Sequence, residues 1–91
     1  PTFNELDKAI QSKDWISVNR FSHKLIPNMN MIGNPFLETE IKWMEDNAVD
    51  QKSQIAILSK WSTIKQEMQK SIEELRLVDS FYQSIETKNK N

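Results

Sequence analysis

The chain has 91 residues, and its 12 Lys and Arg side chains against 13 Asp and Glu give a formal charge of −1. This balance provides no basic field for nucleic acid or for an anionic membrane, so the expected partner is another protein. The absence of cysteine excludes disulfides, thiolate zinc sites and cysteine nucleophiles. No apolar run approaches the roughly 20 residues that a membrane span needs.

One glycine and three prolines leave few residues for tight turns, while helix-forming residues are frequent, which predicts an all-α fold. A first helix is expected at a capping box formed by Thr2 and Glu5. Its buried stripe consists of Phe3, Leu6, Ala9 and Ile10. Asp14 then favours the start of a second helix, because a carboxylate is stabilised at a helix N-terminus.

The second helix carries a seam of core residues spaced alternately by three and four positions: Trp15, Val18, Ser22, Leu25, Met29 and Ile32. The run Gly33-Asn34-Pro35 supplies a C′ glycine, an N-cap and an N1 proline, so the chain should reverse there. A third helix over residues 35–46 should pack antiparallel to the second. Its apolar face consists of Phe36, Leu37, Ile41, Trp43 and Met44.

Asp50 can cap a fourth helix with a heptad of core positions, interrupted only by Ser71. These positions are Ile57, Trp61, Ile64, Met68, Leu75, Val78 and Tyr82. The heptad outruns the third helix, so its far end should overhang. We expect one antiparallel up-and-down four-helix bundle over residues 1–85, with a long C-terminal helix and a frayed polar tail over residues 86–91.

His23 is the only histidine, and it lies about 130° from the centre of the second helix's seam, so its imidazole should reach solvent. Exposed apolar groups around an ionisable side chain are typical of a contact surface, so we interpret this side of the helix as a protein-docking patch. An ordinary surface histidine is the alternative on periodicity alone. The residues that share this side with His23 are Ile16, Asn19, Arg20, Ile26, Pro27 and Asn30.

Short motifs surround His23 in a defined order. From the N-terminus they are Lys13-Asp14-Trp15, Ser22-His23-Lys24-Leu25, Gly33, Leu37, Met44-Glu45 and the heptad from Ile57 to Tyr82. In this order, with a glycine ten residues after the histidine, residues 4–78 resemble the histidine phosphotransfer (HPt) domains of two-component phosphorelays.

The resemblance implies that His23 accepts and donates a phosphoryl group, which it exchanges with aspartates of response-regulator receiver domains. It further implies a monomeric domain with Gly33 as a structural residue, no metal ligands and no cofactor of its own, since Mg²⁺ would be bound by the receiver. The implied localisation is cytoplasmic, within a parent chain such as a membrane-anchored hybrid sensor histidine kinase. Because position 1 is Pro1, we expect the domain to be part of a longer polypeptide.

Two positions depart from the family pattern, which usually has Lys and Gly where this chain has Ile26 and Pro27. Arg20, one turn before His23, is our candidate for the positive charge that supports the phosphoryl group. Pro27 has no N–H to donate to the His23 carbonyl, so we predict a kink in the helix at the histidine.

Three other functions can be compared with phosphotransfer. The phosphoacceptor hairpin of a sensor kinase normally has an acid after its histidine, whereas this chain has Lys24 and four predicted helices. A non-catalytic adaptor, which binds a protein partner without being phosphorylated, stays open because the usual Lys and Gly are missing. A self-sufficient enzyme has no support, because one histidine, no cysteine and no Gly-rich loop leave no complete catalytic set.

Overall fold

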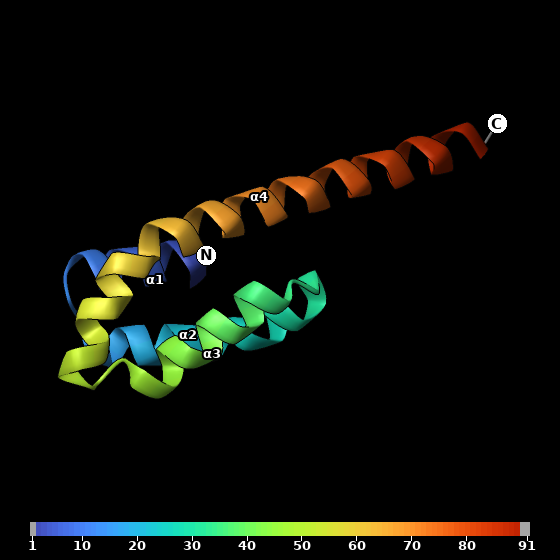
Figure 1. The fold of residues 1–91 in the computed structure, drawn as a ribbon. Helices are drawn as coiled ribbons and strands as arrows, with labels where there is room; N and C mark the ends of the chain where they lie inside the picture. Colours follow the sequence, from blue (N-terminus) through green and yellow to red (C-terminus); the bar gives the residue numbers. More distant parts are fainter. Residues whose placement is uncertain (1, 90–91) are drawn as a thin grey trace.

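The computed structural model describes the backbone of residues 2–89 and the side chains of residues 2–75. Over this range the chain forms helices joined by short turns and contains no strand, which confirms the predicted all-α class (Figure 1). The helices are α1 (Thr2–Gln11), α2 (Trp15–Ile32), α3 (Pro35–Asn47) and α4 (Gln51–Asn89). No helix of the described chain is long and apolar enough to cross a membrane.

The last three helices begin at the N-caps that the sequence predicts. Asp14 and Asp50 each accept a hydrogen bond from the backbone N–H three residues on, at 3.3 and 3.0 Å. Asn34 does the same for Leu37 at 3.2 Å. These side chains satisfy N–H groups that have no partner within the helix, and so they fix where each helix starts. In α1, by contrast, Thr2 already lies within the helix rather than before it.

Two residues in the turns have left-handed backbone conformations. Gly33 has a φ of 70° and donates its N–H to the Met29 carbonyl at 3.1 Å, so it ends α2 as the predicted C′ glycine. Lys13, between α1 and α2, has a φ of 58°. A side chain with a Cβ pays roughly 1 kcal/mol in this conformation, so Lys13 is a strained residue at a position that glycine would occupy more easily.

The core consists of most of the predicted seams of α2 and α4, together with parts of the predicted apolar faces of α1 and α3. On those faces Phe3 and Trp43 are only half-buried, and Phe36 is 43% exposed, so its assignment to the buried face was wrong. The members of the core are fully or almost fully buried: Leu6, Ala9, Ile10, Val18, Leu25, Met29, Leu37, Ile41, Met44, Ala48, Ile57, Trp61, Ile64 and Met68. Trp15 and Ile32, at the two ends of the α2 seam, are half-buried against this core. The burial therefore follows the phase that the three-and-four spacing predicts for both helices.

Polar contacts attach α4 to the other helices. Asp7 of α1 accepts hydrogen bonds from the Trp61 indole at 2.7 Å and from the Lys65 ammonium at 3.1 Å. Asn34, at the turn between α2 and α3, donates its side-chain N–H to Glu67 at 3.0 Å and to Ser71 at 3.2 Å. Ser71, the polar exception in the α4 heptad, is therefore buried, and its hydroxyl oxygen accepts a hydrogen bond from Asn34 of the turn.

Helix α4 determines the length of the molecule. Its 39 residues would span about 58 Å at 1.5 Å per residue, and the longest dimension of the molecule is 59 Å. As predicted, α4 extends well past the other three helices (Figure 1). It reaches Asn89, beyond the expected limit at residue 85, and the last two residues lie outside the described chain.

The exposed fraction of Leu75 shows where the packing of α4 against the other helices ends. Leu75 continues the heptad after Ser71, yet it is 47% exposed. The side chains of Val78 and Tyr82, assigned to the same seam, lie outside the described side chains.

Candidate functional site

His23 projects from the middle of α2 into solvent. Its side chain is 72% exposed, whereas Ser22 and Leu25 on either side of it in the sequence are buried. The imidazole is therefore accessible to a partner, while its neighbours anchor the helix to the core.

A carboxylate from α3 holds one nitrogen of this imidazole. His23 Nδ1 lies 2.6 Å from Glu45 Oε1, and the Glu45 side chain is only 15% exposed. An ionised carboxylate can only accept a hydrogen bond, so the proton of the neutral imidazole is placed on Nδ1. The lone pair is then on Nε2, the ring nitrogen that Glu45 does not contact.

Glu45 is itself held in place from two sides. Its second oxygen accepts a hydrogen bond from Lys42 Nζ at 3.2 Å, and Lys42 also pairs with Asp46 at 3.2 Å. The Asn19 side chain of α2 donates to the Glu45 backbone carbonyl at 2.6 Å. These contacts fix both the carboxylate and the backbone that carries it.

The pKa of Glu45 is consistent with an ionised acceptor. Partial burial raises the pKa of this carboxyl group, but the hydrogen bonds from His23 and Lys42 and the charge of Lys42 lower it by more. The net direction is downward, so Glu45 carries its negative charge at neutral pH and can keep the Nδ1 proton in place.

Reasoning from the sequence named Met44-Glu45 as a motif but gave neither Glu45 nor Lys42 a role at His23. The sequence does contain a signal for this contact, namely the number of residues that separates His23 and Glu45 from the turn between α2 and α3. His23 lies ten residues before Gly33 and Glu45 lies eleven residues after Asn34, so two helices that pack side by side from this turn bring them level. Counting outward from the turn would have indicated the pair.

Arg20, predicted to support the phosphoryl group, is exposed and lies over a neighbouring aromatic ring. Its guanidinium carbon is 5.0 Å from the centre of the Phe21 ring, and Lys24 Nζ is 5.7 Å from the same centre. Both cations therefore lie beside Phe21, within three residues of His23 along α2. The contact that the structure gives Arg20 is with Phe21, a cation–π interaction, and not with Glu45.

The six residues interpreted as a docking patch differ in burial. Ile16 is 77% exposed, and Pro27 and Asn30 are exposed as well. Asn19 is half-buried because it bonds to α3, and Ile26 is half-buried against the core. The accessible part of the patch thus comprises Ile16, Arg20, His23, Pro27 and Asn30, with Ile26 at its edge.

Pro27 lies inside α2, which continues past it to Ile32. The kink expected at His23 stays a prediction.

Among the described residues, no three His, Asp or Glu side chains gather closely enough to hold a metal ion. Comparison of the chain with known protein families, with curated proteins and with solved structures found no match. We therefore infer function from the geometry of the site.

Proposed function

We propose that the domain is a phosphorelay intermediate, an HPt-type antiparallel four-helix bundle that carries a phosphoryl group on His23. It would exchange this group with aspartates of response-regulator receiver domains in the cytoplasm, as part of a two-component system. The observation that supports the proposal best is an exposed imidazole whose Nδ1 is held by the Glu45 carboxylate at 2.6 Å, which leaves Nε2 available to react.

The transfer step follows from the position of the lone pair. Nε2 attacks the phosphorus of an aspartyl phosphate, a new N–P bond forms, and the bond from phosphorus to the aspartate oxygen breaks. The electron pair of that bond leaves with the aspartate as a carboxylate. Because Nε2 carries no proton before the attack, none has to be removed from it.

Glu45 assists this step through charge. Once Nε2 is bonded to phosphorus and Nδ1 keeps its proton, the ring carries a positive charge. The negative carboxylate at 2.6 Å stabilises that charge as it develops, and the partial burial of Glu45 strengthens the interaction. Return of the phosphoryl group to a receiver reverses the same steps.

Such a site needs few residues of its own. Phosphoryl transfer depends on in-line placement and charge stabilisation, and a receiver brings the aspartate together with its Mg²⁺. The domain then has to present one oriented imidazole on an accessible helix, with Ile16, Pro27 and Asn30 available for contact. Arg20 is our candidate on α2 for a cation beside the phosphoryl group.

Phosphotransfer from receivers to the purified domain tests the proposal. A panel of receiver domains, charged with radiolabelled acetyl phosphate, should pass label to the domain in a form that is labile to acid and stable to base. His23→Gln should abolish the label without changing the melting temperature, because an exposed side chain contributes little to stability. Asn28→Gln, an exposed change on the same helix, is the matched control. Label that persists in His23→Gln would contradict the assignment.

A non-catalytic adaptor is the second candidate, and one observation favours it. The family's usual lysine is replaced by Ile26, which is half-buried against the core and brings no charge to the imidazole. An adaptor would bind receivers without accepting label, and His23→Gln would then leave binding unchanged. Titration of the same receiver panel by calorimetry distinguishes the two functions.

A further inference from the structure

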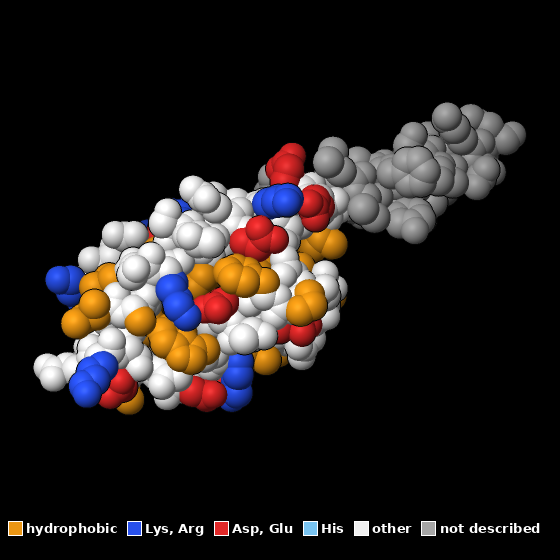
Figure 2. All heavy atoms as spheres, in the orientation of Figure 1, with side chains coloured by type: hydrophobic (Ala, Val, Ile, Leu, Met, Phe, Trp, Pro, Cys, Tyr) orange, Lys and Arg blue, Asp and Glu red, His pale blue; other side chains and the backbone are white. Residues whose placement is uncertain are grey.

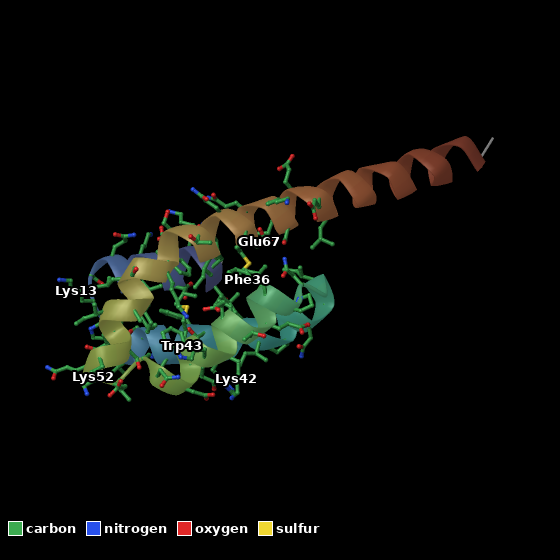
Figure 3. All side chains as sticks on the ribbon, in the orientation of Figure 1. Lys13, Phe36, Lys42, Trp43, Lys52 and Glu67 are labelled. Atoms are coloured by element: carbon green, nitrogen blue, oxygen red, sulfur yellow. The ribbon has the colours of Figure 1, made fainter. Side chains whose placement is uncertain are left out.

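An open hollow of about 400 Å³ lies at the end of the molecule opposite the α4 extension. It is formed by the turn between α1 and α2, the start of α2 and the start of α4, so it is separate from the His23 site. Figure 3 labels Lys13 and Lys52 at this end, and Figure 2 shows apolar side chains beside basic ones there. The side chains that matter are Lys13, Trp15, Lys52, Ile55 and Leu58.

The apolar part of the hollow is not needed for the core. Ile55 is 73% exposed and Leu58 is 42% exposed, whereas Ile57 and Trp61 of the same helix point into the core and are buried. Together with half-buried Trp15, they form an apolar surface that spans α2 and α4. Large apolar side chains that line a concave surface are typical of a binding site.

The charge at the hollow has one sign. Its only ionisable lining residues are Lys13 and Lys52, and neither forms an ion pair within the side chains of residues 2–75. The N-termini of α2 and α4, the positive ends of the helix dipoles, lie at the same place. The carboxylates of Asp14 and Asp50 cap these two helix ends and offset their positive charge, so the positive charge of the lining comes from the two lysines.

The backbone of Lys13 is a further, independent observation. Its φ of 58° is a conformation that a glycine adopts without strain, yet a lysine stands there. Strained residues that persist in a fold are frequent where a side chain serves binding or catalysis. The left-handed residue also ends α1, because Lys13 and Asp14 donate their N–H groups to the carbonyls of Ile10 and Ala9, and the Lys13 side chain lines the hollow.

We propose that this hollow binds an acidic segment of a partner protein. The segment inserts large apolar side chains between Trp15, Ile55 and Leu58, and its carboxylates pair with Lys13 and Lys52. Acidic charge fits because it complements both lysines of the lining, whereas a basic segment would face two like charges. The site does not include His23, so it can be occupied whether or not the domain takes part in phosphotransfer.

Selection from a random peptide display library tests this proposal with the intact chain. The enriched peptides should combine acidic residues with large apolar ones, and the NMR signals of the Trp15 indole and of the Ile55 and Leu58 amides should shift when such a peptide is added. No enrichment, enrichment of neutral or basic peptides, or shifts confined to another surface would overturn the proposal.

Three variants then locate the binding site. Ile55→Asp should weaken peptide binding about tenfold or more, and Lys52→Glu several-fold, while Lys70→Glu, an exposed lysine further along α4, should change little. Lys13→Gly should weaken binding several-fold and at the same time raise the melting temperature, since glycine relieves the strain. Unchanged binding in Lys13→Gly and Ile55→Asp would overturn the proposal.

A second copy of the chain is the other possible occupant. Sedimentation of the peptide-free domain distinguishes the two, because self-association through this surface would be lost in Ile55→Asp. Such a concentration-dependent dimer would overturn the proposal of a peptide partner.

Discussion

Replacing Glu45 with glutamine tests whether the carboxylate at His23 sets the reactive nitrogen. Glutamine has the same shape, but its amide can both donate and accept a hydrogen bond, so it no longer forces the imidazole proton onto Nδ1. Part of the population would then carry the proton on Nε2 and could not attack phosphorus. Glutamine also lacks the negative charge that stabilises the phosphorylated ring.

The expected decrease in the transfer rate can be estimated from the hydrogen bond between His23 and Glu45. A hydrogen bond to a charged group is worth about 1.5 to 3 kcal/mol and is roughly twice as strong as a neutral one. The neutral bond that glutamine keeps, and the 72% exposure of the His23 side chain, reduce the difference to about 1 to 1.5 kcal/mol. Phosphoryl transfer should therefore be about five- to tenfold slower in Glu45→Gln.

Transfer rates from one charged receiver, together with the nitrogen-15 chemical shifts of the imidazole, measure both effects. Asp46→Asn is the matched control, because it makes the same change of charge one residue away and contacts Lys42 but not His23. It should leave the transfer rate and the tautomer unchanged. If Glu45→Gln also kept the wild-type rate and tautomer, the carboxylate would have no part in the chemistry.

Three predictions concern stability. Ser22→Ala should raise the free energy of unfolding in urea by about 1 kcal/mol, because the buried Ser22 hydroxyl has no hydrogen-bond partner; a loss would mean that the hydroxyl is satisfied in solution. Pro27→Ala should raise the melting temperature, since an interior proline costs about 3 kcal/mol in a helix, and it should slow transfer if a kink aims His23; a less stable variant would refute the helical placement of Pro27. The Trp61 indole and Lys65 hold the pKa of Asp7 below its ordinary value of 3.8 against the effect of burial. Because the pKa of Asp7 is lower in the folded state, its ionised carboxylate stabilises the fold at pH values above 3.8, and this stabilisation is lost as the pH falls through the folded pKa. Asp7→Asn should therefore lose less stability than the wild type between about pH 5 and about pH 2. Equal losses would show that Asp7 does not contribute.

The features that the sequence predicted correctly are those that depend on neighbouring residues. Caps such as Asp14 and Asn34 act on an N–H three positions away, and the left-handed glycine at Gly33 ends its own helix. The core seams follow from helical periodicity, because every third or fourth side chain must share a face. These parts of the fold could therefore be located before any packing between helices was known.

The features that the sequence did not predict depend on how far one helix extends beside another. Leu75 fits the heptad of α4, but the turn at Asn34 is level with Ser71, so the helices that could cover Leu75 end before it. Ile26 lies at the edge of the α2 seam, where a small difference in helix position decides how much of it is covered. The contact of His23 with Glu45 depends on the register of α2 against α3, which follows from the distance of each residue from the turn and not from the periodicity within either helix.

The three side-chain hydrogen bonds of Asn34 couple the opening of α3 to the release of α4. Its oxygen caps α3, while its side-chain nitrogen bonds to Glu67 and Ser71 of α4. Opening of the first turn of α3 therefore withdraws two contacts from α4, and release of α4 removes the restraint on the cap. In native-state hydrogen exchange, this turn and the middle of α4 should behave as one cooperative unit, although more than thirty residues separate them in the sequence.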